Sequence, residues 1–204
     1  MKNLIAQLRI SFTATLFLAV LLCGIYPLLV WVLAQGLFPA KANGSLVMEN
    51  GKMLGSSLIS QGFTAPKFFH PRPSAAGQGY DATSSGGSNL GPTSKKLVDT
   101  VRQRVDDYRS ENNLAPDAMV PADAVTASAS GLDPHIGLKN ALLQAARVAR
   151  ARGLSEDIVL KQIKLHTEGR DLGILGEPRV NVLMLNLALD RMPVSIVTMS
   201  FGRD

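Results

Sequence analysis

Cysteine is nearly absent from this 204-residue chain, which has only Cys23, and histidine is scarce, with His70, His135 and His166 alone. A single cysteine excludes a disulfide framework and a thiolate-rich metal site, so any folded domain must be held together by packing. The histidines are far apart, and no two have the i, i+4 spacing that helical zinc sites use. We therefore expect no metal site.

Charge is missing from one long stretch near the N-terminus. No Asp, Glu, Lys, Arg or His lies between Arg9 and Lys41, and the run from Phe12 to Leu33 is largely apolar. A bilayer core about 30 Å thick needs roughly 20 apolar helical residues, so a transmembrane helix is predicted over residues 10–34. A cleaved signal peptide is the alternative, because Ala40-Lys41-Ala42 suits a signal peptidase, but its apolar region would span only about 7 to 15 residues.

Basic residues lie mainly on one side of this run. Lys2, Arg9 and the amino terminus precede it, and only Lys41 is close to its other end. Because cytoplasmic flanks carry the excess of Lys and Arg, we expect residues 1–9 in the cytoplasm and residues 35–204 outside it. The chain would then be a single-pass protein of the cell inner membrane, in contact with lipid, with an extracytoplasmic C-terminal domain.

Small residues recur along one side of the predicted span. Ser11, Thr15, Ala19 and Cys23 are four residues apart and share a helix face. Such a stripe lets another helix approach closely in lipid, so these four are candidates for packing against a partner span. Small residues are also common in any membrane helix, and the sequence leaves both interpretations open. Pro27 removes a backbone donor and predicts a kink in the outer half.

A strong excess of charge of either sign is also lacking. The net charge is +5, of which the part beyond the span contributes about +3, and its basic residues are interspersed with Asp and Glu. Nucleic-acid-binding surfaces gather their basic residues instead, so we expect no nucleic-acid partner. The 170 residues after the span suffice for one modest domain.

The pattern beyond the span predicts an α+β domain with a β-hairpin or small sheet and about three helices. Asn50-Gly51 suits a type I′ turn joining strands over residues 45–49 and 52–59. Helical periodicity follows a cap at Thr93 or Ser94, and again over residues 138–152 and 155–169. The residues expected to face the core are Leu97, Val101, Val105 and Tyr108 on the first helix, Leu142, Ala145, Ala146 and Ala149 on the second, and Val159, Ile163 and His166 on the third.

Two further patterns belong to this domain. Arg147, Arg150 and Arg152 are expected on a basic side of the second helix, opposite its core face. Near the end of the chain, Val180, Val182 and Met184 alternate as in a strand before a more helical stretch.

A long segment without regular periodicity, residues 60–94, lies between the hairpin and the first helix. Gly86 and Gly91 have the separation of a phosphate-binding loop, but Pro92 stands where that motif needs lysine. A glycine-rich loop that approaches a partner closely is the better interpretation. The candidate loop contacts are Arg72, Ser74, Gly86, Gly87, Ser88 and Asn89.

No sequence motif predicts catalysis. Ser128, Ser130, Asp133 and His135 have the residue types of a hydrolase, but they lie within eight residues and lack the first glycine of a nucleophile elbow. We therefore predict no catalytic residues, assign no cofactor-binding residue, and interpret the chain as a membrane-anchored accessory or binding domain.

Several segments together carry a family resemblance that spans the chain in order to Asp190. They are Pro39-Ala40-Lys41-Ala42-Asn43-Gly44-Ser45, Gly55-Ser56-Ser57-Leu58-Ile59, Arg72-Pro73-Ser74, Ser85-Gly86-Gly87-Ser88-Asn89-Leu90-Gly91, Val125-Thr126-Ala127-Ser128-Ala129-Ser130-Gly131-Leu132-Asp133-Pro134-His135-Ile136 and Val180-Asn181-Val182-Leu183-Met184-Leu185-Asn186-Leu187-Ala188-Leu189-Asp190. With the single N-terminal span, this set resembles the C subunit of the Kdp-type potassium-transporting P-type ATPase.

The resemblance implies a non-catalytic subunit of a four-subunit complex that imports potassium with high affinity at the expense of ATP. The implied partners are an ATP-hydrolysing pump subunit, a channel-like potassium-binding subunit and a small single-span subunit. ATP and potassium would be handled by the complex, with no cofactor intrinsic to this chain. Family accounts describe the C subunit as a catalytic chaperone that raises the pump's affinity for ATP, and Gln144 to Ala149 matches the segment where nucleotide contact would be argued.

The chain departs from the family pattern in two places. Met184 stands where an acidic residue is expected, and a tail over residues 192–204 extends past the usual end. A free-standing membrane-anchored extracytoplasmic binding protein is the main alternative function, and an anchored hydrolase is a more distant one.

Overall fold

The computed structural model describes residues 2–192, so the tail over residues 192–204 lies, apart from Met192, outside the described residues. The chain forms two compact units, Met1–Ser56 and Ser57–Asp204. Each unit is described separately below, and the predicted limits of 1–9, 10–34 and 35–204 stay a prediction.

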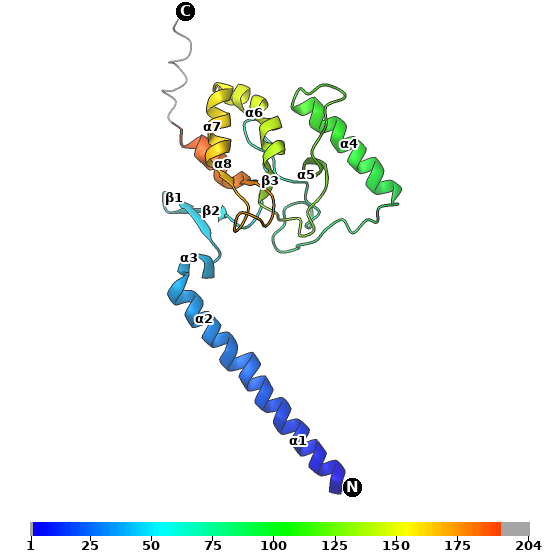
Figure 1. Cartoon of the computed structure of the whole chain (residues 1–204), viewed down its shortest axis with the longest axis vertical. Coiled ribbons are helices and arrows are strands. Elements are labelled where there is room, and N and C mark those ends of the chain that lie inside the picture. The colour runs from blue at the N-terminus through cyan, green and yellow to red at the C-terminus, as the bar shows by residue number, and fades with distance from the viewer. Residues whose placement is uncertain (1, 193–204) are drawn as a thin grey trace, which may run out of the picture. The chain divides into compact units, whose positions relative to one another are not determined.

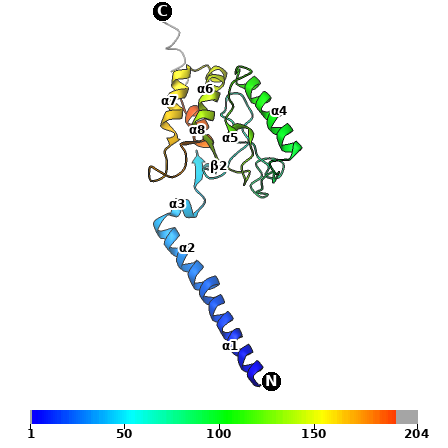
Figure 2. The same cartoon turned by 45° about the vertical axis from the view of Figure 1, so that its right-hand side comes forward.

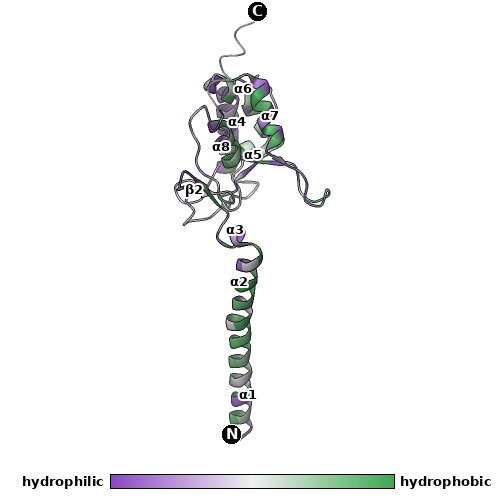
Figure 3. Cartoon of the chain, turned by 90° about the vertical axis from the view of Figure 1, so that its left-hand side faces the viewer, coloured by the Kyte–Doolittle hydropathy of each residue, from purple (hydrophilic) through white to green (hydrophobic). Residues whose placement is uncertain are grey.

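The first unit begins with one long apolar helix, coloured blue in Figure 1. Helix α1 (Lys2–Ala19), the π-helical turn η1 (Val20–Ile25) and α2 (Tyr26–Leu37) follow one another without a break. Residues Asn3–Leu37, 35 in all, are long and apolar enough to cross a membrane, and Figure 3 shows the helix mainly in hydrophobic green. The predicted apolar helix is confirmed.

The structure has a π-helical turn just before Pro27, and the predicted kink stays a prediction. The N–H of Tyr26 donates to the carbonyl of Leu21, five residues back, and Pro27 then lies in the first turn of α2. Proline has no backbone N–H and is tolerated in the first turn of a helix, where that group has no partner within the helix. A π-helical turn is a known way to accommodate a proline inside a membrane helix.

A short helix and a hairpin complete this unit. Helix α3 (Pro39–Ala42) leads into the antiparallel strands β1 (Leu46–Glu49) and β2 (Lys52–Ser56). The turn residues Asn50 and Gly51 have φ of 49° and 77°, as a type I′ turn requires. The hairpin prediction is confirmed, although β2 ends three residues before Ile59.

The second unit is built around a small antiparallel sheet of order β3-β5-β4. Its strands are β3 (His135–Gly137), β4 (Thr167–Glu168) and β5 (Arg179–Asn181). Helices α6 (Leu138–Arg152) and α7 (Glu156–Leu165) pack side by side, as Figures 1 and 2 show, and α8 (Val182–Asp190) packs against α7. The buried core comes from these elements together with one loop residue, Phe69.

Two further helices precede the sheet in the sequence. Helix α4 (Lys95–Glu111) is capped by Ser94, whose Oγ accepts a hydrogen bond from the N–H of Leu97 at 3.4 Å. The short helix α5 (Ala122–Val125) packs against α4. Helix α6 ends as predicted at Gly153, where φ is +66°, a conformation that glycine adopts without a steric penalty.

Several local predictions are wrong. Val182 and Met184 are helical, because the Asn181 side chain caps α8 by accepting the N–H of Met184 at 3.1 Å. Helix α7 ends at Leu165 rather than near Gly169, because residues 167–168 pair with β5 and His166 is only half buried.

The predicted faces of α6 also need correction. Leu142 is 44% exposed rather than in the core. Arg147, expected in solvent, is 6% exposed, and the side chain of Arg152 is 9% exposed and ion-paired with Asp190 at 2.7 Å. Of the expected basic side, only Arg150 is fully exposed. The buried arginine has many partners, which are part of the candidate site.

Candidate functional site

An extended segment around Phe69 and His70 is held between two helices by side-chain amides. The N–H of Phe69 donates to Oδ1 of Asn186 on α8 at 2.8 Å, and Nδ2 of Asn186 donates back to the Phe69 carbonyl at 3.0 Å. His70 forms the same two-way pair with Gln144 of α6, at 2.8 and 3.2 Å. Both amides are 1% exposed, so these bonds form away from water.

Arg147 extends this polar network through the interior. Its Nη1 donates to the carbonyls of Pro66 and Phe68 at 2.6 and 3.0 Å. Its Nε donates to Oδ1 of Asn112 at 3.0 Å, and its Nη2 to Oε1 of Gln144 at 2.7 Å. One guanidinium thus joins the extended segment, the end of α4 and the middle of α6. Burial lowers its pKa, but an arginine stays charged at any working pH.

The N-terminal half of α6 is joined to α4 and α5 in a similar way. The hydroxyl of Tyr108 donates to Oδ1 of Asn140 at 2.9 Å, and Nδ2 of Asn140 donates to Oδ2 of Asp123 at 2.9 Å. The same carboxylate oxygen accepts the N–H of Gly137 at 2.8 Å. Burial, followed by the nearby charge of Asp123, raises the pKa of the Tyr108 hydroxyl, which therefore stays a neutral donor.

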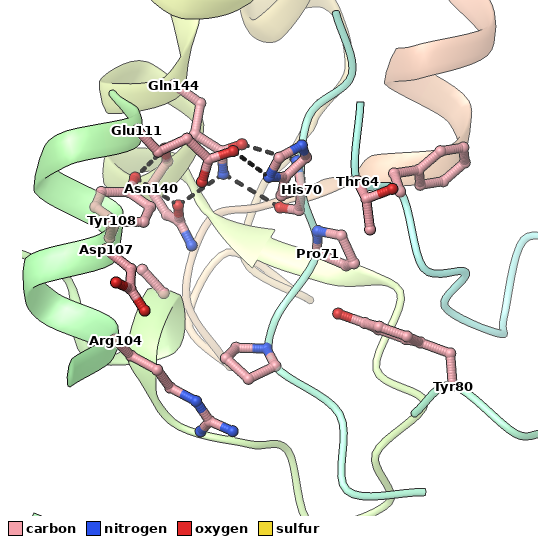
Figure 4. Close-up of a pocket in the computed structure, with 13 residues that line it drawn as sticks. Thr64, His70, Pro71, Tyr80, Arg104, Asp107, Tyr108, Glu111, Asn140 and Gln144 are labelled. Carbon is pink, nitrogen blue, oxygen red and sulfur yellow. Dashed lines mark hydrogen bonds and ion pairs between the residues drawn. The ribbon is translucent and has the colours of Figure 1, made fainter. Parts of the chain in front are cut away.

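A cleft of about 370 Å³ opens beside this network. Its lining residues come from α4, α5, α6 and the loop segments before α4 (Figure 4), and they include Thr64, His70, Tyr80, Arg104, Asp107, Glu111 and Gln144. Figure 4 shows the His70 ring between Glu111 and the extended chain, with Nδ1 3.0 Å from Oε1 of Glu111. Nε2 of the same ring lies 3.2 Å from the Ala65 carbonyl. Both ring nitrogens therefore face acceptors.

The electrostatics of the cleft are mixed. The hydrogen bond from His70, partly opposed by burial, lowers the pKa of Glu111, so this carboxyl is ionised near neutral pH. Asp107 adds a second carboxylate, which accepts from Gln103 at 2.8 Å, and Arg104 supplies one fixed cation, which donates to the Val125 carbonyl at 3.1 Å. The cleft thus has two carboxylates, one arginine and one histidine, and the carboxylates would repel a polyphosphate. A small neutral polar molecule would instead find both hydrogen-bond donors and acceptors there.

Comparison with known proteins agrees with the resemblance read from the sequence. The family described as "KdpC: K+-transporting ATPase, c chain" matches residues 8–191. The chain belongs to the KdpC family. It is 55% identical over 192 residues to the potassium-transporting ATPase KdpC subunit of Nitratidesulfovibrio vulgaris, covering 93% of this chain and 96% of that protein.

Relatives in other bacterial groups are equally similar to this KdpC family member. The subunit of the same name from Mycobacterium bovis is 54% identical over 186 residues, covering 91% of this chain and 98% of its own length. That of Myxococcus xanthus is 58% identical over 170 residues, covering 82% of this chain and 79% of its own length. The similarity therefore extends over both compact units.

The predicted loop contacts fall into two groups in this KdpC family member. Arg72 pairs with Asp133 at 3.0 Å, the Ser74 hydroxyl donates to the Gly131 carbonyl at 2.7 Å, and the N–H of Gly86 donates to the Ser130 carbonyl at 3.0 Å. A Cβ on Gly87 would lie 2.9 Å from the Ala129 carbonyl oxygen. These four residues hold the loop against residues 128–133 of the same chain, while Ser88 and Asn89 are exposed. Contact of any of them with a partner stays a prediction.

Asp133 belongs to the same region as the serines considered for a hydrolase. Burial raises its pKa, but hydrogen bonds from His135 and Arg72 outweigh burial and bring the pKa to about 2. The hydroxyl of Ser130 accepts the N–H of Leu132 at 3.1 Å and thus closes a local turn. Asp133 therefore acts as a structural acceptor for its neighbours.

The small-residue stripe is exposed along the N-terminal helix. Ser11, Thr15 and Ala19 lie on α1, whereas Cys23 lies in η1, where the wider π-helical turn changes its angular position relative to the other three. Packing of the stripe against a partner helix stays a prediction.

Sequence reasoning missed the buried polar network. Asn140, Gln144 and Arg147 have the i, i+4, i+7 spacing of a single helix face, so their proximity was readable from the sequence. Their burial was not readable, because their partners are distant along the chain. Gln144 and Arg147 donate to backbone carbonyls more than 70 residues away, and Asn140 contacts side chains 17 and 32 residues away.

Proposed function

We propose that this chain is the non-catalytic accessory subunit of an ATP-driven, high-affinity potassium import complex. The observation that carries the proposal is family membership over residues 8–191, together with one helix of membrane-spanning length followed by a domain built as a connected polar and apolar core. Its partners would be a pump subunit that hydrolyses ATP, a channel-like subunit that binds potassium and a small single-span subunit. The chain itself would stabilise that assembly in the inner membrane.

The test is recovery of the complex. A tagged chain, extracted from the membrane in mild detergent, should migrate on a native gel far above 21.8 kDa and bring with it a subunit that becomes phosphorylated by ATP. Migration as a lone monomer under conditions that keep other membrane complexes intact would overturn the proposal and favour a free-standing anchored binding protein.

We further propose that the domain lies outside the cytoplasm and docks on the outer face of the channel-like subunit. The support is the excess of positive charge before the span, at Lys2 and Arg9, over that after it, at Lys41. In spheroplasts, a protease added outside should remove a tag placed after Asp204. Protection of that tag in intact spheroplasts and its cleavage only after lysis would place the domain inside and refute this topology.

An outside domain can affect ATP only by conformational coupling, and we propose that any increase in the pump's ATP affinity is of this indirect kind. The geometry of the α6 segment supports an indirect effect on ATP affinity. Gln144, in the segment where a nucleotide contact would be argued, has its amide occupied by four protein hydrogen bonds, and the neighbouring cleft carries the carboxylates of Asp107 and Glu111.

Calorimetric titration of the purified full-length chain with ATP should therefore show no saturable heat. The pump's affinity for ATP should nevertheless fall in complexes carrying Arg147→Met, which weakens the domain without touching the cytoplasm. Saturable ATP binding to the isolated chain would contradict the indirect mechanism.

A further inference from the structure

Three exposed aliphatic side chains lie at the tip of one loop of the second unit. The loop joins β4 to β5 and extends away from the rest of its unit in Figures 2 and 3, with hydrophobic residues towards its end. Leu172, Ile174 and Leu175, the apolar tip, are 89%, 75% and 56% exposed. Single exposed apolar residues are common, but a cluster of three within four positions indicates a binding surface.

The loop holds this tip in a defined conformation. Asp171 and Leu175 exchange two backbone hydrogen bonds of 2.9 Å, and Leu172 has a φ of +54°, which is costly for a bulky side chain. At the base, Arg170 pairs with both oxygens of Glu177 at 3.0 Å. The aliphatic groups are thus presented to solvent by an ordered turn.

The acidic residues near the tip are each paired with an arginine. Arg179 pairs with Glu168 at 3.0 Å and with Asp171 at 3.3 Å, and Glu177 is paired with Arg170. Two arginines against three carboxylates leave the loop base with one formal negative charge, but each of these carboxylates lies within ion-pair distance of an arginine.

An apolar groove of about 660 Å³ continues from the base of this loop. It runs between α6 and α7 and reaches Gly169 and Pro178, the two ends of the loop. Its other lining residues are Leu138, Leu142, Leu160, Ile163, Lys164 and Thr167. The groove therefore ends at the base of the loop that carries the apolar tip, with the Arg170–Glu177 ion pair between groove and tip.

One lysine lines this groove, and two others are close to its lining residues in the sequence of the same helices. Lys164 lines the groove, Lys161 is one turn before it on α7, and Lys139 is next to Leu138 on α6. These three exposed residues are the basic rim. The acids of α7, Glu156 and Asp157, lie in its first turn, at the opposite end from Lys164. Aliphatic groups beside lysines, with the local acids paired, are complementary to the headgroup region of an anionic bilayer.

We propose that the apolar tip and basic rim form a second membrane contact, which docks the domain on anionic lipid. The tip enters the headgroup and upper acyl region, and the basic rim faces the lipid phosphates. The transmembrane helix strengthens this contact, because it keeps the domain close to the bilayer at a high effective concentration. Even a weak interaction with the membrane surface is then populated. The inference needs only the span and is independent of the proposed complex.

The test uses the full-length chain reconstituted into vesicles. In a Cys23→Ala background, an environment-sensitive fluorophore is placed by Ile174→Cys at the tip or, as a control, by Met119→Cys, a 78% exposed position on another loop. Nitroxide-labelled lipids should quench the tip fluorophore several-fold more than the control. Quenching should be stronger in phosphatidylcholine mixed with phosphatidylglycerol than in phosphatidylcholine alone.

Charge reversal tests the basic rim. Lys161→Glu with Lys164→Glu should reduce tip quenching in the mixed vesicles, since each lysine near an anionic surface is worth about a fivefold change in binding. Circular dichroism checks that the variant is folded. Equal quenching of tip and control, or quenching that ignores both lipid charge and lysine reversal, would overturn the proposal. Shielding of the tip only after other subunits are added would assign the surface to a protein partner instead.

Discussion

Arg147 is the residue whose removal should cost this domain most. It is 6% exposed and donates four hydrogen bonds, to the Pro66 and Phe68 carbonyls and to the side chains of Asn112 and Gln144. Arg147→Met keeps the length of the side chain but removes every donor. The acceptors on three separate segments are then left buried without this partner.

The magnitude follows from those acceptors. Hydrogen bonds from a charged donor contribute about 1.5–3 kcal/mol each, and the desolvation of the guanidinium offsets a large part of that sum. An acceptor left unsatisfied costs about 1–3 kcal/mol, so for these four acceptors, after the offset from guanidinium desolvation, we expect Arg147→Met to cost about 3–5 kcal/mol. For a domain of this size, that corresponds to a midpoint of thermal unfolding lowered by roughly 10 °C.

Urea unfolding of the full-length chain in mild detergent, followed by circular dichroism, measures this effect. The control is Arg150→Met, which makes the same chemical change three residues later on the same helix at an exposed position. The control should change the free energy of unfolding by no more than about 0.5 kcal/mol. A cost below about 1 kcal/mol for Arg147→Met, with an unchanged urea dependence, would show that the buried network is not a major source of stability.

Three other predictions concern the remaining features. The pKa of Asp133, about 2, lies below its value in the unfolded chain, so the ionised carboxylate stabilises the domain above about pH 4. This contribution is lost as the pH falls through 2. Asp133→Asn should therefore flatten that part of the pH profile of the free energy of unfolding, by up to about 2 kcal/mol. Gly131→Ala should destabilise by about 2 kcal/mol or more, because φ is +69° and a Cβ would lie 2.7 Å from neighbouring atoms, whereas Gly91→Ala, in open space, should be nearly neutral in the same unfolding assay. Ala19→Leu should weaken recovery of partner subunits in affinity purification, and Ala14→Leu, on another face of α1, should not; equal recovery with both variants would count against the small-residue stripe.

The elements predictable from sequence are those with strong local signals. The long apolar helix follows from the absence of charge between Arg9 and Lys41, and the hairpin turn from Asn50-Gly51. Helix α6 was predicted with its end at Gly153, because apolar periodicity, basic residues and a terminal glycine coincide there. The resemblance carried by the loop segments was also sufficient to identify the family.

The remaining features depend on distant parts of the chain. Strands of two or three residues, as in β3, β4 and β5, are too short to show a period of two. The alternation of Val180, Val182 and Met184 resembles a strand, although Asn181 caps a helix there. Arg147 was placed in solvent because a charged residue on a helix is usually exposed. Only the folded chain brings backbone carbonyls to its guanidinium.

The two-way amide pairs at Phe69 and His70 give an irregular segment a fixed register. Asn186 on α8 and Gln144 on α6 each bond both backbone polar groups of one residue, as a neighbouring strand would. Sliding the segment by one residue would exchange the fully buried Phe69 with His70, whose side chain is 20% exposed. A one-residue insertion or deletion between Pro66 and Pro71 should therefore be far more damaging than one at Ser88 or Asn89, although both stretches are loops. Length variation among relatives is expected in the second stretch and not in the first.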